Sequence, residues 1–177
     1  MIRGNYTGLR AVELSDLEKM RDWRNHPEFR KNFREHRELN LQNQSDWFIK
    51  TSGNSSDFMF IIIDLETNEE IGACGLLYTN WIIRSSDFSF YIGKDLMYID
   101  EKYAIDAAKT LIDYGFNDIN LNKIWMELYE FDEKKMNFFQ NQLGFQIDGR
   151  LRQNAFWDGR YWDSHIISLL STEFKQL

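Results

Sequence analysis

The stretch that decides the fold is Phe88-Ser89-Phe90-Tyr91-Ile92, followed after a short linker by Tyr103-Ala104. In the first segment Phe88, Phe90 and Ile92 recur at every second position, which is typical of a half-buried strand. The second segment opens a helix that we expect to run to Phe116. A helix N-terminus has free N–H groups and a positive dipole end, so this strand–turn–helix predicts an anion site.

The turn that leads into this helix has the sequence Ile99-Asp100-Glu101-Lys102. Glycine suits a phosphate-binding loop, because the backbone must approach the phosphate closely and can need a positive φ. Here two carboxylates repel an anion unless they turn away, whereas the Lys102 ammonium could contact a phosphate directly. Two interpretations stay open: a coenzyme loop of altered sequence, or a solvated charged turn that no longer binds coenzyme tightly.

The bulk composition predicts one domain, residues 1–177, with a substantial core, because 43% of the residues are apolar and 16% aromatic. A formal net charge of −7 argues against nonspecific binding to nucleic acid or to anionic membranes. Cys74 is the only cysteine and is expected to be a buried, inert thiol. The histidines lack ligand-like spacing, so we expect no metal site. With neither a signal peptide nor a membrane-length apolar run, we expect a cytoplasmic protein.

Local patterns predict the remaining elements. Ser15 with Glu18 forms a capping-box pattern at a helix start, and Pro27 separates two short helices. Asp158-Gly159 is a strong two-residue hairpin turn. Further strands are expected at 9–12, 58–63, 71–78, 124–129 and on both sides of that turn, and further helical segments at 41–50 and 133–142. This order predicts an α/β (α+β) fold with a mixed, mostly antiparallel six- to seven-stranded sheet flanked by helices.

This order and several strings resemble the GNAT acyltransferase superfamily, in its Rim-type branch, over nearly the whole chain. Leu9-Arg10-Ala11-Val12 with Asp16-Leu17 is similar to the opening strand and helix of that branch. Trp23-Arg24-Asn25-His26-Pro27 resembles the string of its amino-sugar N-acetyltransferases. The closing segment is matched by Leu143-Gly144-Phe145, Gly149-Arg150-Leu151-Arg152 and Asp158-Gly159-Arg160-Tyr161.

The resemblance implies acetyl-coenzyme A as the acetyl donor. The backbone of a splayed strand would pair with the pantetheine arm, and the helix N-terminus would meet the pyrophosphate. The family's loop, Arg/Gln-x-x-Gly-x-Gly/Ala, falls on Ile99, Lys102 and Ala104, and only Ala104 matches it. Asp132 stands where relatives often have an asparagine, with a helix N-cap as the equally good structural explanation. The implied coenzyme-binding residues are Phe90, Tyr91, Ile92, Lys102, Tyr103, Ala104, Asp132 and Phe139.

Glu127 is the candidate general base, since acetyl transfer to an ammonium requires that a proton be removed. It alternates with the apolar residues of its strand, and sugar-acetyltransferase relatives have a glutamate base in this strand. An exposed cross-strand charge is the structural alternative. Those relatives have a tyrosine acid twelve residues later. Counting from Glu127 reaches Phe139, and counting back from Gly144-Phe145 reaches Gln140, so that acid is missing. Tyr129 or Tyr91 is a conceivable substitute.

The resemblance places Trp23, Arg24 and Asn25 in the helical region that shapes the acceptor pocket, with packing as the alternative role of Trp23. Arginines between Arg34 and Arg37 could hold a nucleotide diphosphate, although a charged surface loop is the simpler interpretation. The main hypothesis is therefore an acetyl-CoA-dependent N-acetyltransferase that acts on a small-molecule amine, a nucleotide-linked amino sugar. Alternatives are a protein N-terminal (ribosomal-protein type) or polyamine acetyltransferase, and a non-catalytic GNAT-like binding domain. We expect a monomer or homodimer with neither nucleic-acid nor membrane partners.

Overall fold

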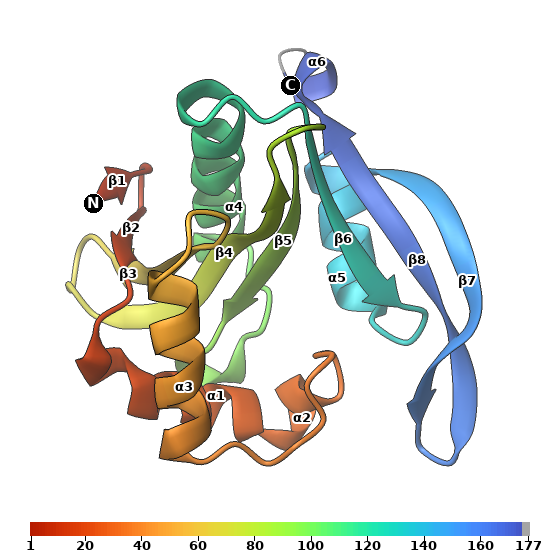
Figure 1. Cartoon of the computed structure of the whole chain (residues 1–177), viewed down its shortest axis with the longest axis horizontal. Helices are drawn as coiled ribbons and strands as arrows, with labels where there is room; N and C mark the ends of the chain where they lie inside the picture. Colours follow the sequence, from red (N-terminus) through yellow and green to blue (C-terminus); the bar gives the residue numbers. More distant parts are fainter. Residues whose placement is uncertain (175–177) are drawn as a thin grey trace.

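The computed structural model describes residues 1–174 and is built on one eight-stranded sheet (Figure 1). The strand order is β1-β2-β3-β4-β5-β6-β8-β7, and all neighbours are antiparallel except β5 and β6. This confirms the mixed, mostly antiparallel sheet. The strand beyond the expected number is β1, which has two residues and is therefore too short to show a period. The strands are β1 (Ile2–Arg3), β2 (Thr7–Ala11), β3 (Phe58–Asp64), β4 (Glu70–Asn80), β5 (Ser85–Ile92), β6 (Lys123–Tyr129), β7 (Gln146–Trp157) and β8 (Arg160–Leu170).

Helices cover both faces of this sheet. In Figure 1, α3 lies in front of the sheet and α1 and α2 lie below β4 and β5, whereas α4 lies behind β4. Alternation along β5 follows this division, because Tyr91 packs against Trp23 and Phe29 while Phe90 packs against Phe138 and Phe139. The helices are α1 (Leu17–Asn25), α2 (Pro27–Arg30), α3 (Leu41–Ser52), α4 (Tyr103–Asp113), α5 (Glu133–Asn137) and α6 (Ser171–Phe174).

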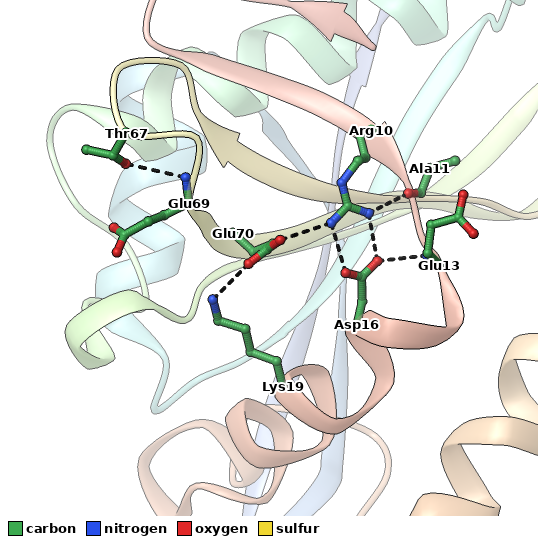
Figure 2. Close-up of polar contacts among 8 residues, drawn as sticks. All are labelled: Arg10, Ala11, Glu13, Asp16, Lys19, Thr67, Glu69 and Glu70. Carbon is green, nitrogen blue, oxygen red and sulfur yellow. Dashed lines mark hydrogen bonds and ion pairs between the residues drawn. The ribbon is translucent and has the colours of Figure 1, made fainter.

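The start of α1 is fixed by a charged network (Figure 2). The two terminal nitrogens of Arg10 donate to the two carboxylate oxygens of Asp16 at 2.7 and 2.8 Å. Asp16 also accepts the backbone N–H of Glu13 at 2.7 Å, and Glu70 bridges Arg10 and Lys19. The expected capping pair of Ser15 and Glu18 is therefore wrong, because Glu13 and Asp16 form the capping box, at the 3-10 turn Leu14–Asp16 that precedes α1. The network joins β2, α1 and the start of β4.

In the two long segments predicted as helices, the α-helix ends earlier than expected and a π turn follows. The pattern predicted to reach Phe116 is α-helical only to Asp113, and a π turn follows over Tyr114–Asp118. Likewise, α5 ends at Asn137, and the π turn Phe138–Gln142 completes the predicted helix. A π turn shifts the hydrogen-bond pattern to i→i+5 and so accommodates one extra residue per turn.

The predicted turns are confirmed. Pro27 occupies the first position of α2 and separates it from α1. Asp158 and Gly159 have φ values of 52° and 74°, as a type I′ hairpin turn between β7 and β8 requires. Gly144 has a φ of 72° after the last turn of the α5 region, a conformation that favours glycine. These local signals specify where the chain reverses.

Cys74 lies on β4 with its side chain fully buried, and burial raises the pKa of its thiol. This agrees with the inert thiol that the sequence predicts, because the thiolate is the reactive form. Within residues 1–174, the helices are all too short or too polar to span a bilayer.

Candidate active site

A cavity opens where β5 and β6 diverge. The two strands pair only over Ser85–Asp87 and Lys123–Trp125, and Figure 1 shows them separating beyond that point. The cavity has a volume of about 510 Å³. It lies between the strands, α1, the loop 31–40, α3 and one residue of α5. Its polar and charged lining includes Arg24, Asn32, Arg34, Glu35, Arg37, Asn43, Gln44, Asp46, Lys50, Tyr78, Asp87, Ser89, Glu127, Tyr129 and Lys135.

The backbone of β5 is only partly available along this cavity. Ile92 exchanges both of its backbone hydrogen bonds with Tyr98, at 2.9 and 2.8 Å. Tyr91 lies opposite Ala73 of β4, and alternation turns its backbone groups toward that strand. Phe90 faces the same way as Ile92 but lies past the end of the β5–β6 pairing. Of the three predicted backbone positions, only Phe90 is therefore placed to pair with a pantetheine arm.

The predicted base, Glu127, lines the cavity from β6, and its side chain is 13% exposed. One carboxylate oxygen accepts hydrogen bonds from Ser164 Oγ at 2.6 Å and Asn154 Nδ2 at 2.7 Å. The other accepts Arg34 Nε at 3.3 Å. This excludes the alternative of a freely solvated cross-strand charge, because three side chains fix the carboxylate at the divergence of the strands.

Arg34 joins the two diverging strands. Besides Glu127 on β6, its guanidinium pairs with Asp87 on β5, a carboxylate that is almost completely buried. Burial raises the pKa of Asp87, and the charge and hydrogen bond of Arg34 oppose that shift. The sequence placed Arg34 in a charged loop but gave no sign of its partners, which lie 53 and 93 residues away.

The N-terminus of α4 already has an anion in place. The Asp100 carboxylate accepts the backbone N–H groups of Lys102 (2.9 Å), Tyr103 (2.8 Å) and Ala104 (2.7 Å). The Lys102 ammonium lies 4.0 Å from Glu66 and over the ring of Tyr103. The predicted phosphate-binding amides are therefore occupied by a side chain of the same turn, and coenzyme phosphates must displace it to reach them.

Two predicted coenzyme-binding residues of the α5 region, Asp132 and Phe139, have different roles in the structure. Asp132 caps α5 by accepting the Lys135 backbone N–H at 3.3 Å, and its other oxygen accepts the hydroxyl of Tyr98. The structural explanation of Asp132 is thus confirmed. Phe139 is fully buried against Phe88 and Phe145 and does not line the cavity, which corrects its assignment to the coenzyme site.

Of the three residues predicted to bind the acceptor, only Arg24 lines the cavity. Arg24 lines the cavity, stacks its guanidinium over Phe33 and leaves its Nε without a hydrogen-bond partner in the described residues. Trp23 packs instead against Tyr91, with its ring over the Gly93 backbone. Asn25 binds the backbone of Leu39 twice, at 2.8 Å each. Trp23 and Asn25 are therefore corrected from substrate contacts to packing and loop-positioning residues.

Two site residues were missed by the sequence reasoning. The sequence assigned no role to Asp87 or to Lys135. Both are in fact buried, and both line the cavity. The spacing of Asp87 within β5 is the only signal that could have identified either, because it shares the cavity face with Ser89.

The residues present fit the thioester end of acetyl-coenzyme A, since a cavity with free β5 backbone at Phe90 can accept a pantetheine arm. The pyrophosphate end is taken by Asp100 as the structure stands. Among residues 1–174, no group of three or more His, Cys, Asp or Glu side chains is arranged to hold a metal ion.

The single parallel pair of the sheet splays open beside the fixed Glu127 carboxylate, as the resemblance to the GNAT acyltransferases leads us to expect. The chain belongs to the Acetyltransferase (GNAT) domain family, whose model matches residues 7–146. This confirms the superfamily, which the matching model describes as acetyltransferases. The family match does not single out the Rim-type branch or its amino-sugar enzymes.

The chain is similar to curated relatives with related names. It is 32% identical over 115 residues to the uncharacterized N-acetyltransferase p20 of Bacillus licheniformis, covering 65% of this chain and 63% of that protein. It is 24% identical over 166 residues to spermidine N(1)-acetyltransferase of Vibrio cholerae, covering 94% of each. It is 29% identical to that of Escherichia coli K12, covering 66% of this chain and 60% of the relative. The match thus spans less than two thirds of the first and third relatives.

Solved structures support the fold. A complex of the Vibrio cholerae spermidine N-acetyltransferase with CoA and spermine superimposes with a TM-score of 0.87 at 23% identity, covering 96% of this chain and 98% of that one. A dodecameric structure of the same protein has a TM-score of 0.80 at 24% identity, covering 96% of each chain.

Proposed function

We propose that this protein transfers the acetyl group of acetyl-coenzyme A to a primary amine of a small molecule by direct attack. The observation that carries the proposal is the Glu127 carboxylate, fixed by Ser164, Asn154 and Arg34 where β5 and β6 diverge. Glu127 would take the proton of the attacking amine, and the Phe90 backbone would align the donor. The low exposure of Glu127 limits competing water at that point.

Polyamines are the first acceptor class to test, in place of the amino sugar of the main hypothesis. Relatives named spermidine N(1)-acetyltransferases support this choice. The cavity also offers four carboxylates with which a cationic chain can pair: Glu35, Asp46, Asp87 and Glu127. A polyamine ammonium group could replace Arg34 or Arg37 as the ion-pair partner of a carboxylate.

A nucleotide-linked amino sugar remains the second candidate on one specific observation. Arg24, Arg34 and Arg37 line the same cavity, together with Lys50. Arginine binds phosphate oxygens bidentately, so a diphosphate could replace the carboxylates that pair with Arg34 and Arg37. A polyamine would thus bind the carboxylates of these ion pairs, whereas a sugar nucleotide would bind their arginines.

The test is release of free thiol from acetyl-coenzyme A in the presence of three kinds of amine: spermidine, a nucleotide-linked 4-amino sugar and a peptide with a free N-terminus. We expect release with spermidine, and Asp46→Asn should raise its KM while leaving that of the sugar nucleotide unchanged. Release with the sugar nucleotide alone, lost in Arg37→Gln, would establish the second candidate. If no amine releases thiol while calorimetry detects coenzyme A binding, the non-catalytic alternative is supported.

Assembly is part of the proposal. The sequence leads us to propose one domain that forms a monomer or homodimer, whereas one solved relative is a dodecamer. Light scattering coupled to size-exclusion chromatography gives the particle mass directly. A measured mass of twelve chains would overturn the proposal of a monomer or homodimer.

A further inference from the structure

The proposed transfer lacks a proton donor for the departing thiolate, because the tyrosine of the sugar-acetyltransferase relatives has no counterpart. We propose that the Lys135 ammonium supplies that proton, an inference that rests on the proposed function. Lys135 is 6% exposed and lines the cavity from α5. It is the only α5 residue of the described chain to do so.

The position of Lys135 is set by the packing of α5. The region of α5 lies on the face of the sheet to which Phe90 points, opposite α1 and α2, as its Phe138 contact indicates. The rest of the cavity lining comes from β4, β5 and β6 and from the opposite face. The Lys135 side chain therefore reaches the cavity between the diverging strands, where the thioester of a donor paired with Phe90 must lie.

The ammonium is not committed to another group. Among the described residues, Lys135 Nζ has no hydrogen bond or ion pair, and its nearest aromatic contact is the Tyr98 ring, with the centroid at 5.3 Å. The carboxylates around it have other partners: Asp132 accepts the Tyr98 hydroxyl, and Asp87 pairs with Arg34. The Lys135 ammonium therefore keeps its protons uncommitted, on a side chain that lines the cavity.

The surroundings of Lys135 favour proton release. Burial lowers the pKa of Lys135, the charges of Asp132 and Asp87 act in the opposite direction, and Arg34 and Arg24 lower it further. An ammonium whose pKa is lowered toward that of a thiol transfers its proton more readily.

The other hydroxyl groups are less suitable. Tyr98 already directs its proton to Asp132. Burial raises the pKa of Tyr91 to about 12, and its ring packs among Trp23, Phe29 and Phe33 away from the α5 face. Tyr129 lines the cavity, so it is the competing candidate that an experiment must include.

The step balances without an outside reagent. The neutral amine forms the C–N bond as the C–S bond breaks, and the electron pair of that bond stays on sulfur. Glu127 takes the N–H proton and Lys135 Nζ gives a proton to sulfur, so the products are the amide and the coenzyme thiol. Solvent then carries a proton from Glu127 back to Lys135.

The kinetic test compares Lys135→Met with Lys109→Met, which removes an exposed lysine of α4, and with Tyr129→Phe. We expect Lys135→Met to lower kcat with acetyl-coenzyme A about 10²-fold or more, and Lys109→Met to have little effect. Tyr129→Phe, which changes a residue of the cavity lining, should lower kcat much less than Lys135→Met does. An acetyl thioester of an acidic aromatic thiol needs no proton on leaving, so Lys135→Met should turn it over nearly as well as the wild type. Equal losses with both donors, or a loss in Tyr129→Phe instead, would overturn the assignment.

A binding measurement separates this inference from the proposed function. The thiol of bound coenzyme A is titrated by the ultraviolet absorbance of its thiolate, without acceptor. We expect a lower thiol pKa on the wild type than on Lys135→Met, with Lys135→Arg restoring part of the shift. Identical titrations would sink the Lys135 assignment even if acetyl transfer is real. A Lys135-dependent shift without acetyl transfer to any amine would instead overturn the proposed function alone. Failure of the wild type to bind coenzyme A would overturn both.

Discussion

The Asp100 carboxylate accepts the backbone N–H of Ala104 at 2.7 Å, and with it two further amides of the same turn. Helix N-terminal amides are the groups that bind phosphate in many coenzyme sites. The residue that looked like an obstacle in the sequence is thus the group that satisfies this helix end. The N-terminus of α4 is thus capped by its own turn.

Asp100→Ala should strengthen coenzyme A binding and lower the free energy of unfolding of the protein without coenzyme. The substitution removes a competing anion from three amides, while the lost cap costs about 1 kcal/mol of unfolding free energy. Calorimetry and thermal unfolding measure the two effects on the same sample. Glu101→Gln is the control, because it removes a neighbouring charge without freeing an amide. If both variants bind coenzyme equally, simple charge repulsion accounts for the effect and the occupied amides do not matter.

Glu127→Gln should lower kcat about 10²- to 10⁴-fold, the usual contribution of a general base. The amide keeps the size of the side chain and can still accept a hydrogen bond from Ser164, so coenzyme affinity should be unchanged. Steady-state thiol release at saturating amine measures the effect. Glu130→Gln, an exposed neighbour just after β6, is the matched control. Unchanged turnover in Glu127→Gln would show that another group removes the proton.

Phe139→Tyr should destabilise the protein by about 1–3 kcal/mol without raising kcat. The new hydroxyl would enter a core of Phe88, Phe90 and Phe145, where nothing is placed to pair with it. Gln140→Tyr, at the half-buried neighbouring position, should be tolerated and equally inactive as a proton donor. Urea unfolding and thiol release measure the two effects. A gain in kcat from either tyrosine would mean that the π turn presents that position to the cavity.

Asp106→Asn should destabilise the protein at neutral pH and have little effect at low pH. Asp106 on α4 accepts the backbone N–H groups of Asn5, Tyr6 and Thr7 and the Thr7 hydroxyl. Burial raises the pKa of Asp106, but these hydrogen bonds outweigh it and lower the pKa below its usual 3.8. The stabilisation is present above pH 3.8 and is lost as the pH falls through the folded-state value.

The measurement for Asp106 is denaturant unfolding at pH 7 and at about pH 3. We expect a loss of about 1–3 kcal/mol at pH 7 that shrinks toward zero in acid. Asp113→Asn, an exposed carboxylate at the end of the same helix, should give a small difference at both pH values. A constant penalty for Asp106→Asn across this range would mean that shape, and not charge, is what the site requires.

Local chemistry explains which parts of the fold were predictable. The alternation through Phe88 and Phe90, the Pro27 break and the Asp158-Gly159 turn each act within a few residues, so the sequence displays them. The main charged contacts of the site join residues that are far apart in the sequence, so local patterns do not reveal them. Arg34 meets Glu127 across 93 residues. Lys135 is buried because of how α5 packs, and nothing in its neighbouring sequence distinguishes it from a solvated lysine.

The coenzyme turn illustrates a different limit. The sequence marked Asp100 as atypical for a phosphate-binding turn. Whether its carboxylate points away from the helix amides or toward them depends only on the direction of the side chain. The structure turns Asp100 toward the amides. Composition cannot make that choice, because the same carboxylate satisfies either arrangement.

The π turn after Asn137 gives the helix that carries Lys135 two independent halves. Each added residue turns an α-helix by about 100°, so a single inserted codon would ordinarily rotate everything that follows it. Here the turn absorbs the surplus residue, which explains why counting from Glu127 and counting from Gly144 differ by one. A residue can therefore be gained or lost in the π turn while Lys135, before the turn, and Phe145, after it, keep their register with the sheet.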